Sequence, residues 1–396
     1  MTSFNGDYSQ YTVKGYPVRH RKKECFPPVA IRLPPEYRAI MNEIRTLDQS
    51  LDRMILGADD YLQLAEEAYA SNIHWSVHLE GNPLTEDQVR ETTRRFTRHL
   101  QKETSNGPTQ KILNHLYTLF DSTPFAFPWT VNTVKKVHAL LMKGVETDPT
   151  PGQMRDETEK DAATYGPDGA GYFIACPWSS VAEEMRNLTD WLASSPYDEL
   201  ITATLFFHEF ESIHPFLDGN GRTGRTLFQL LLQMLGLRNC RLCKFEYEML
   251  RDRERYYTLL AYTDSSQDYM PFIMYTAEAV LRAYKEAAER FSAKDRVKDL
   301  DEVSKILARQ AKKVRCFTVA EATSWITGLG SEAVRSRLGA LTSAGILTKE
   351  GNTRASRYFF RDPFAAVKTA VTGITAENNL RSSVSGGAAV DRSEKN

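Results

Sequence analysis

Apolar residues recur at helical spacing over most of this chain. Between Pro35 and about Ala70 the predicted inward-facing residues include Leu51, Met54 and Ile55, which fall on one side of a helix with about 3.6 residues per turn. The same period predicts further helices at 71–81, from residue 85 onward, and at 112–119, 131–142, 180–193, 200–213, 223–235, 247–262 and 269–291. The pattern therefore predicts a mostly α-helical fold.

Residues 144–177 interrupt this pattern, because they have no helical period and are rich in Gly, Pro, Asp and Thr. The cluster at 165–169 is typical of a turn, and residues 172–174 beside it are typical of a short strand. A long non-helical excursion inside a helical domain is more often functional than structural. We therefore predict a short β-hairpin flap at about 152–177.

Past a charged segment at 292–301, the pattern changes to short elements. Residues 318–321 form a helix capping box, and another short helix is predicted to begin at Ser331. Strand-like segments at 346–349 and 357–360 then flank a tight turn. Two helices joined by a turn and followed by a two-stranded wing predict a small winged helix-turn-helix domain.

These patterns divide the chain into five parts. We predict an N-terminal arm at 1–34, a helical region at 35–110, a larger helical core at 111–291, the winged helix at 300–362 and a disordered tail at 363–396. The tail is predicted to be disordered because it is polar and rich in small residues, a composition that buries too little apolar surface to fold.

Composition sets broad limits on the class of protein. The 396 residues are 41% hydrophobic and 26% charged, as in ordinary soluble globular proteins, and the chain is long enough to bury a full core. A net charge of −1 gives no global attraction to nucleic acid or anionic membranes. No apolar run reaches membrane-spanning length, and five scattered cysteines indicate a reducing compartment. We therefore expect a cytoplasmic protein without membrane contact.

The most informative segment is the run from His214 to Arg225, HPFLDGNGRTGR, which leads into a predicted helix. The His214 imidazole can accept a proton near neutral pH. Gly219, Gly221 and Gly224 allow backbone N–H groups to approach an anion at a helix N-terminus, where the helix dipole favours negative charge. Arginines bind phosphate oxygens in a bidentate manner. The segment therefore predicts a phosphate-transfer site.

Three other interpretations of nearby residues are weaker. The glycine spacing at 219–224 matches a dinucleotide-binding fingerprint, but that motif needs a preceding buried strand, whereas the preceding segment has helical spacing. A zinc site at His208 and His214 is disfavoured, because residues six positions apart do not share a helical face. Cys240 and Cys243 lack a second cysteine pair and are predicted to be semi-buried thiols.

This phosphate-transfer segment resembles the signature of the Fic-domain family, His-Pro-Phe-x-(Asp/Glu)-Gly-Asn-Gly-Arg-x-x-Arg, and matches it at every defined position. The run from Ser76 to Gly81, SVHLEG, is similar to that family's inhibitory-helix motif, (Ser/Thr)-x-x-x-Glu-(Gly/Asn). The similarity of arrangement covers roughly residues 30–290, and the appended winged helix looks like that of a bacterial subgroup. The resemblance implies a Fic-type helical bundle with its inhibitory helix at 71–81.

Members of that family generally transfer AMP from ATP to a Ser, Thr or Tyr hydroxyl of a protein, so the resemblance implies a protein adenylyltransferase. His214 would be the general base, and Asp218 would hold Mg²⁺ between the α- and β-phosphates, since hard oxygen ligands suit that ion. Asn220 and the loop backbone would cradle phosphate oxygens. The implied ATP-binding residues are those of the loop and the first helical turn, with one tyrosine on the adenine side: Gly219, Asn220, Gly221, Arg222, Thr223, Gly224, Arg225 and Tyr257.

The resemblance assigns autoinhibition to Glu80. Its carboxylate would pair with the Arg225 guanidinium that should bind the γ-phosphate, so that ATP enters in a pose unsuited to transfer. Ser76, one helical turn earlier, would hydrogen-bond and orient that carboxylate. The flap would align the target protein by strand addition, main chain to main chain, through Tyr172, Phe173, Ile174 and Ala175.

Two rival functions remain open. An inhibitory glutamate at this position could orient water for removal of AMP from a modified protein, and a DNA-binding regulator could use the Fic core only to sense nucleotide. Residues 301–362 hold eleven Lys/Arg and six Asp/Glu, an excess equally compatible with DNA contact and with protein docking or dimerisation. The basic residues that could meet phosphates are Arg335, Arg337, Lys349, Arg354 and Arg357. The sequence leaves the target, the nucleotide preference and a homodimer open.

Overall fold

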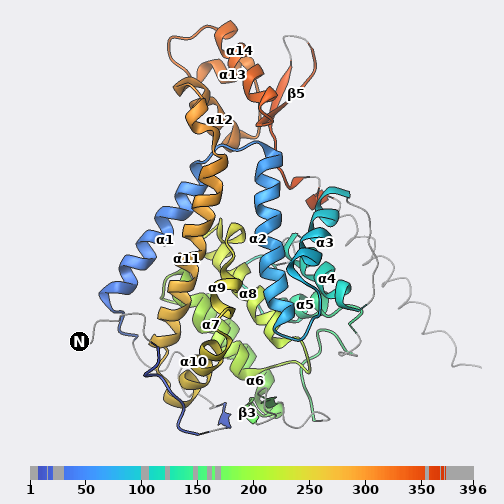
Figure 1. The fold of residues 1–396 in the computed structure, drawn as a ribbon, viewed down its shortest axis with the longest axis vertical. Helices are drawn as coiled ribbons and strands as arrows, with labels where there is room; N and C mark the ends of the chain where they lie inside the picture. The colour runs from blue at the N-terminus through green and yellow to red at the C-terminus, as the bar shows by residue number, and fades with distance from the viewer. Residues whose placement is uncertain are drawn as a thin grey trace, which may run out of the picture.

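Helices form most of the regular structure, as the apolar spacing predicts. The computed structural model describes residues 8–15, 17–20, 31–99, 107–120, 125–145, 150–157, 163–165, 171–352, 356–365, 367–369 and 371. Figure 1 shows a tall helical body with a small lobe at one end, formed by the C-terminal elements. No described helix is both long and apolar enough to cross a bilayer. The prediction of a mostly α-helical fold is confirmed.

The body is built from helices that come before and after the flap along the chain. Five helices precede the flap: α1 (Pro35–Arg53), α2 (Ala58–His78), α3 (Glu86–His99), α4 (Pro108–Phe120) and α5 (Val131–Leu141). Three follow it: α6 (Trp178–Ala193), α7 (Glu199–Ile213) and α8 (Asn220–Leu235). A short 3-10 helix and three more helices complete the body: η2 (Cys240–Leu242), α9 (Phe245–Leu250), α10 (Arg253–Ser266) and α11 (Met270–Lys294).

Helix α7 lies at the centre of the body and packs against α6, α8 and α11. Phe206, Phe207 and Phe210 of α7 are fully buried, and nearly all of its remaining residues are buried too. A helix that is buried on nearly all sides belongs in the interior of a domain. The loop between α7 and α8 carries the predicted phosphate-transfer segment, so a buried helix supports that loop.

The inhibitory segment predicted at 71–81 is not a separate helix. It is the second half of α2, which runs from Ala58 to His78 and is followed by a turn at 79–81. No glycine or proline occurs between Ala58 and Gly81, so no residue in this stretch strongly opposes helix propagation. The turn therefore sits at one end of a long, straight element whose other end is near the C-terminal lobe (Figure 1).

A break occurs instead at 54–57, inside the stretch that the apolar spacing predicts as one helix. Ile55 from this break is buried in the core of the C-terminal lobe. The backbone N–H of Ala58, at the start of α2, donates to the Gly345 carbonyl oxygen of the lobe at 3.2 Å. Gly57 at the N-cap of α2 favours a break here, and the packing of Ile55 in the lobe makes the break a joint between the lobe and the body.

The flap is a three-stranded sheet with the order β1-β3-β2. Strands β2 (Ala163–Tyr165) and β3 (Gly171–Ile174) form the predicted hairpin, while β1 (Val18–Arg19) pairs in parallel with the other side of β3. Strand β1 lies in the N-terminal arm predicted at 1–34. The strand itself was not predicted, since two residues are too few to show a period in the sequence. Most of the turn predicted at 165–169 lies outside the described residues.

The C-terminal lobe has its own apolar core, which includes Leu307, Phe317 and Leu338. Its second sheet has the order β4-β6-β5, with antiparallel pairs. The predicted capping box is present, because the Glu321 N–H donates to Thr318 Oγ1 at 3.3 Å. Its elements are η3 (Arg296–Asp299), α12 (Glu302–Val314), β4 (Cys316–Thr318), α13 (Val319–Ser324), α14 (Ser331–Ser343), β5 (Leu347–Glu350) and β6 (Arg357–Phe360).

The first residues of the predicted disordered tail pack against the body. Phe364 is 2% exposed, its ring centroid lies 5.7 Å from that of Tyr61, and Val367 and Val371 are also buried. The prediction of disorder is wrong for this described part of the tail, because these apolar residues recur at helical spacing while the average composition hides them. Residues 372–396 lie outside the described part of the chain.

We expect Phe364→Ala to lower the free energy of unfolding by about 3–5 kcal/mol, the usual cost of deleting a buried phenylalanine ring. Ile306→Ala is a suitable control, because Ile306 is 40% exposed and surface changes usually stay within about 0.5 kcal/mol. Urea denaturation of the full-length variants measures both. Equal effects of the two substitutions would show that the tail does not dock on the body.

Candidate active site

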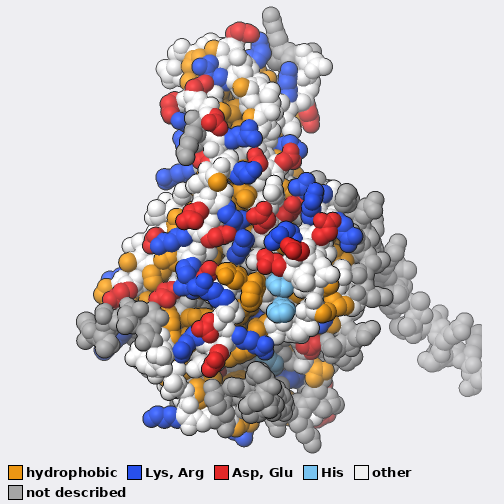
Figure 2. Space-filling view, viewed as in Figure 1, with side chains coloured by type: hydrophobic (Ala, Val, Ile, Leu, Met, Phe, Trp, Pro, Cys, Tyr) orange, Lys and Arg blue, Asp and Glu red, His pale blue; other side chains and the backbone are white. Residues whose placement is uncertain are grey.

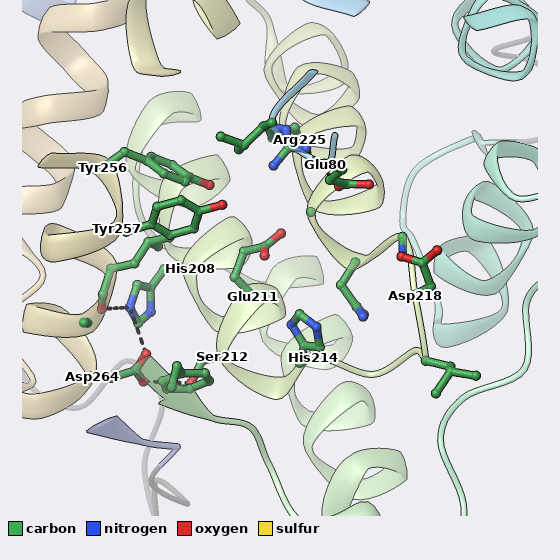
Figure 3. Close-up of a pocket in the computed structure, with 18 residues that line it drawn as sticks. Glu80, His208, Glu211, Ser212, His214, Asp218, Arg225, Tyr256, Tyr257 and Asp264 are labelled. Atoms are coloured by element: carbon green, nitrogen blue, oxygen red, sulfur yellow. Dashed lines mark hydrogen bonds and ion pairs between the residues drawn. The ribbon is translucent and has the colours of Figure 1, made fainter. Parts of the chain in front are cut away.

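A cavity of about 330 Å³ lies where α7 ends, α8 begins and β3 faces α10 (Figure 3). This volume is in the usual range for small-molecule sites. The cavity brings together most of the predicted site residues from segments far apart in the sequence: Glu80, Phe173, His214, Asp218, Gly219, Asn220, Gly221, Arg225 and Tyr257.

His214 follows α7 in the left-handed conformation, with φ 52° and ψ 60°, which is unfavourable for a residue with a Cβ. Its carbonyl oxygen accepts a hydrogen bond from Arg155 Nε at 2.7 Å. Arg155 Nη2 also donates to the carbonyl oxygens of Cys176 and Ile213, at 2.8 and 3.1 Å. A buried guanidinium therefore holds this strained turn in place, and no local sequence pattern marks Arg155 for that role.

The protonation state of His214 suits a proton acceptor. Burial and the nearby positive charge of Arg155 lower the pKa of His214 to about 4, because both disfavour the imidazolium form. The imidazole is therefore neutral at pH 7. Figure 3 shows it beside the cavity between Glu211 and Asp218.

The loop after His214 depends on a glycine and on an amide. Gly219 has φ 75°, and a Cβ there would lie 2.5 Å from Met142 Sδ, so no other residue fits without a shift. Asn220 Oδ1 accepts from the Phe216 N–H at 2.9 Å, and Asn220 Nδ2 donates to the Phe216 carbonyl at 2.8 Å. The Asn220 side chain thus fastens the loop, and the residue also lines the cavity, so its contact with phosphates stays a prediction. The first N–H groups of α8 have no intrahelical acceptor and suit an anion.

Asp218 lies at the mouth of the cavity with its side chain 35% exposed. Its Oδ1 accepts from the Gly219 N–H at 2.6 Å, and its Oδ2 lies 3.4 Å from Arg222 Nη2. Its carbonyl oxygen accepts from His138 Nε2 at 2.9 Å, and the His138 ring stacks on Phe216 at 3.7 Å. His138 thus fixes the backbone of the residue that carries this carboxylate, a role that only the tertiary structure reveals.

The Glu80 carboxylate contacts two guanidiniums of α8. Its Oε2 pairs with Arg222 Nε, and its Oε1 lies 3.1 Å from Arg225 Nη2. Arg222 and Arg225 are 1% and 3% exposed, so these charge-assisted pairs lie in a region of weak solvent screening. The predicted pair with Arg225 is present in the structure, and Arg222 is a second partner that the sequence analysis missed.

Ser76 contacts the cation rather than the carboxylate. Its Oγ accepts from Arg225 Nε at 3.0 Å, and its carbonyl oxygen accepts from Arg225 Nη2 at 2.9 Å. A guanidinium offers five N–H donors in one plane, so these contacts fix the plane of Arg225. The predicted contact between Ser76 and Glu80 is therefore corrected to one between Ser76 and Arg225.

Two glycines of α8 permit close approaches. A Cβ at Gly221 would lie 2.9 Å from Glu80 Oε1, and a Cβ at Gly224 would lie 2.2 Å from Glu211 Oε1. Gly221 therefore leaves space for the Glu80 carboxylate, and Gly224 lets α8 pack closely on α7. Gly224 and the fully buried Thr223 do not line the cavity, which corrects their predicted role as direct ATP-binding residues.

The opposite wall of the cavity is aromatic. Tyr257 of α10 and Phe173 of β3 both line it, and Figure 3 shows Tyr256 and Tyr257 side by side. Burial raises the pKa of Tyr257, so its phenol stays neutral and presents a flat face suited to a planar base. The predicted role of Tyr257 on the adenine side stays a prediction.

Strand β3 has no open edge. The His20 N–H donates to the Ile174 carbonyl oxygen at 2.8 Å on one side, and β2 pairs on the other side. Ala175 lies just past the end of the strand. The predicted docking of a target along Tyr172–Ala175 is corrected in this respect: a target strand can add only to the outer edge of β2, or to β3 after β1 has left.

Two acidic residues near Arg225 were missed by the sequence analysis. Glu211 of α7 lines the cavity, and Glu246 Oε2 of α9 lies 3.5 Å from Arg225 Nε. Burial raises the pKa of each carboxyl to about 7, while Arg225 acts in the opposite direction. Each is therefore partly protonated at neutral pH. The only sign of Glu211 in the sequence is an acidic residue inside an apolar helical run.

A hydrogen-bonded group lies below the aromatic wall. Ser212 Oγ donates to Asp264 Oδ1 at 2.7 Å and lies 2.7 Å from His20 Nδ1. His208 Nε2 lies 3.6 Å from Asp264 Oδ2, so His208 contacts this group rather than sharing a ligand set with His214. Ser212 and Asp264 line the cavity and add polar groups beside its aromatic wall.

A metal ion would need ligands beyond the protein. Among the described residues, no group of three His, Cys, Asp or Glu side chains is placed to hold one. Mg²⁺ is commonly bound through one or two carboxylates and completes its shell with waters and substrate phosphates. The partly exposed carboxylate of Asp218 fits that mode.

Comparisons with known proteins agree with this geometry. Residues 128–232 match the model of the Fic/DOC family. A protein adenylyltransferase Fic of Drosophila willistoni is 27% identical over 268 residues, which cover 62% of this chain and 50% of the relative. One of Aedes aegypti is 26% identical over 249 residues, 60% of this chain and 46% of the relative. This chain thus spans about half the length of these curated relatives.

A solved structure supports the fold. The crystal structure of a Fic family protein from Desulfovibrio desulfuricans G20 superposes with a TM-score of 0.55 and 22% identity, covering 84% of this chain and 97% of that chain. The helical architecture is therefore that of a Fic fold, as the resemblance implies.

We expect the His214 imidazole to titrate near pH 4, well below the usual value of about 6.5. Since folding lowers this pKa, the unfolded chain binds more protons between the two values, and His214 reduces stability as the pH falls through that window. Histidine NMR of the full chain, with His214→Gln for assignment, measures the midpoint. A midpoint at or above 6.5 would contradict the described environment.

Proposed function

We propose that this chain is a protein adenylyltransferase, which transfers AMP from ATP to a Ser, Thr or Tyr hydroxyl of a protein. One observation carries the proposal: a neutral imidazole lies beside the same cavity as a glycine-rich helix N-terminus and buried guanidiniums. The helix start and Arg225 suit phosphates, and the aromatic wall with Tyr257 suits a nucleobase. The matches to proteins named protein adenylyltransferase Fic support the same activity.

In the proposed reaction, the target hydroxyl oxygen attacks the α-phosphorus of ATP. A P–O bond to the target forms, the bond between the α-phosphorus and the bridging oxygen breaks, and pyrophosphate leaves. His214 accepts the hydroxyl proton. A pKa of about 4 makes free His214 a weak base, but the negative charge of a bound triphosphate would raise it and so strengthen the base when substrate is present.

The surrounding residues would orient the phosphates. The first N–H groups of α8 would meet phosphate oxygens, and Arg222 and Arg225 would compensate their charge. Asp218 would hold Mg²⁺, which supplies charge neutralisation across the phosphates when bound. His138 and Arg155 support this arrangement by fixing Asp218 and the backbone of His214.

We further propose that Glu80 keeps this activity low. Its carboxylate occupies both arginines that a triphosphate would need. A nucleotide must then bind in another pose or displace the carboxylate, which costs the interactions of a buried, charge-assisted pair. Ser76 strengthens the block indirectly, because it fixes the plane of Arg225 against α2.

Glu80→Gly should raise AMP transfer, and Glu80→Gly with His214→Ala should show none. Hydrogen bonds to charged groups contribute about 1.5–3 kcal/mol, and about 1.4 kcal/mol corresponds to a tenfold rate change, so we expect an increase of at least about tenfold. Radiolabel transfer from α-labelled ATP, with Mg²⁺, to the protein itself and to a lysate measures it.

Two further variants make this test specific. Glu80→Gln keeps the shape of the side chain but removes its charge, and should also activate if the ion pairs cause the block. Asp87→Gly changes an exposed carboxylate in the first turn of α3 and should leave transfer unchanged. No label transfer by Glu80→Gly, with folding shown by circular dichroism, would refute the proposed activity and its inhibition together.

Removal of AMP is a second candidate, favoured by the placement of Glu80. Its side chain is 24% exposed and lines the cavity, so it could orient a water for attack on an AMP-modified side chain. A protein modified beforehand by Glu80→Gly supplies the substrate. Faster release of AMP by the wild type than by Glu80→Gly would favour this activity.

The structure offers fewer free basic side chains for DNA contact in the C-terminal lobe than its sequence suggests. Arg335 Nη1 lies 2.8 Å from Glu332, and Arg337 Nε lies 3.2 Å from Asp301. Two of the predicted phosphate contacts thus have acidic partners within the lobe, and Arg354 lies outside the described residues. Lys349 and Arg357 are exposed. DNA contact, protein docking and a homodimer therefore stay proposals for this lobe.

A further inference from the structure

A second cavity lies at the junction between the body and the C-terminal lobe. Its volume is about 100 Å³, and its walls come from the end of α1, the first turn of α2, η2, α12 and the segment after β6. It is smaller than the sites that enclose whole cofactors. Figure 2 shows Lys and Arg side chains, interspersed with Asp and Glu, around the neck that joins the lobe to the body.

The lining of this junction cavity is strongly basic. It contains only two carboxylates, Asp52 and Asp362, in a protein with a net charge of −1. The cationic side chains come from both the body and the lobe: Arg53, Arg241, Arg309, Lys312, Arg315, Arg361 and Lys368. Such an excess of like charge in one recess opposes folding unless something compensates it.

The carboxylates compensate only part of this charge. Asp362 Oδ2 forms two long ion pairs, with Arg315 Nη1 at 4.0 Å and with Lys368 Nζ at 3.9 Å. Asp52 lies 3.6 Å from Lys312 Nζ. Arg361 pairs with Asp59, outside the cavity lining, at 3.4 Å. No described carboxylate forms an ion pair with the remaining cations of the lining.

Helix dipoles compensate a further part. The C-terminal ends of α1 and α12 both meet the cavity, and the Lys312 ammonium donates to the Asp52 carbonyl oxygen at 2.6 Å. Each helix end carries roughly half a negative charge, so two ends supply about one. Several positive charges remain. Burial lowers the pKa of Lys312, which is the response expected of an ammonium short of counter-charge.

Arg241 provides the clearest sign of a missing partner. Its Nε is buried and makes no hydrogen bond within the described structure. Its guanidinium lies over the Phe364 ring, 5.3 Å from the centroid, which holds the group in place without satisfying that donor. A buried N–H donor left without an acceptor costs free energy. An anion in the cavity would supply the acceptor.

We propose that the junction cavity binds a phosphate group, carried by free phosphate or by a small phosphorylated metabolite. A tetrahedral oxyanion accepts hydrogen bonds from several planar guanidiniums and from an ammonium at once. The recess is partly apolar, with Met54, Ile55, Tyr61 and Phe360 in its walls, and a small enclosed site suits one phosphate group better than the backbone of a duplex.

Such an anion would join the two parts of the molecule. Arg309 and Lys312 belong to α12 of the lobe, whereas Arg241 belongs to η2 of the body. Tyr61, in the first turn of α2, also lines the cavity. Binding should therefore stabilise the junction and the start of the helix that leads to Glu80.

The test measures binding of inorganic phosphate to the full chain by calorimetry, with thermal unfolding in phosphate and in chloride at equal ionic strength. We expect saturable binding and a higher unfolding temperature in phosphate. Arg309→Gln and Arg241→Gln should each weaken binding at least about tenfold. Arg309 is exposed, so its substitution leaves folding intact even if Arg241→Gln does not fold.

Two control variants locate the signal. Arg335→Gln removes an exposed arginine of the lobe outside the cavity and should leave phosphate binding unchanged. Arg225→Gln removes the guanidinium of the larger cavity and should also leave it unchanged. Ribose 5-phosphate and glycerol 3-phosphate are compared with phosphate, and the tighter ligand identifies the source of the group.

Three results would overturn the proposal. Phosphate could give no more stabilisation than chloride. Binding could survive Arg309→Gln and disappear in Arg225→Gln, which would place it in the larger cavity. A DNA duplex could bind in an Arg309-dependent way while phosphate and the phosphorylated metabolites do not, which would make the basic junction a nucleic-acid contact.

Discussion

The candidate active site depends on how two buried guanidiniums are compensated. Arg222 and Arg225 lie on the first turns of α8, where the fold removes almost all solvent from them. Buried cations must be paired, because an uncompensated charge in a low-dielectric interior is very unfavourable. In this structure Glu80 supplies the main counter-charge. The phosphates of a nucleotide carry charge of the same sign, so the proposed inhibition and the proposed nucleotide binding would meet one electrostatic requirement in two ways.

This requirement explains why the neighbouring carboxyls differ in their behaviour. Glu211 and Glu246 are close enough to feel Arg225, yet burial raises the pKa of both to about 7. Glu80 and Glu246 both lie within ion-pair distance of Arg225, at 3.1 and 3.5 Å. For Glu211 and Glu246, burial opposes the ionised form more strongly than Arg225 favours it.

The sequence predicted the type of chemistry at the site better than it predicted the residues that hold the site in place. The run from His214 to Arg225 is local, and its residue types alone indicate phosphate chemistry. Arg155 and His138 act through long-range contacts with backbone carbonyls, and no short motif encodes such contacts. The predicted partner of Ser76 was wrong for a related reason, because helical spacing gives proximity but not which group a hydroxyl faces.

The same distinction holds for the fold. Helical periodicity identified most helices of the body, but a two-residue strand such as β1 has no period, and the docked residue Phe364 is hidden in a polar tail. The break at 54–57 contains Gly57, but apolar spacing continues across it, and its role shows only in the packing of Ile55 in the lobe. Elements fixed by local sequence were therefore predictable, whereas contacts between distant segments were not.

Helix α2 connects the two charged regions of the molecule. Its first residue is hydrogen-bonded to Gly345 of the lobe, and Ser76 near its other end is bonded to Arg225. A continuous helix transmits displacement along its axis, because each turn is tied to the next by backbone hydrogen bonds. A change in the lobe that moved the start of α2 would strain the contacts of Ser76 and Glu80 with α8. One continuous helix thus joins the lobe to the turn that carries Glu80.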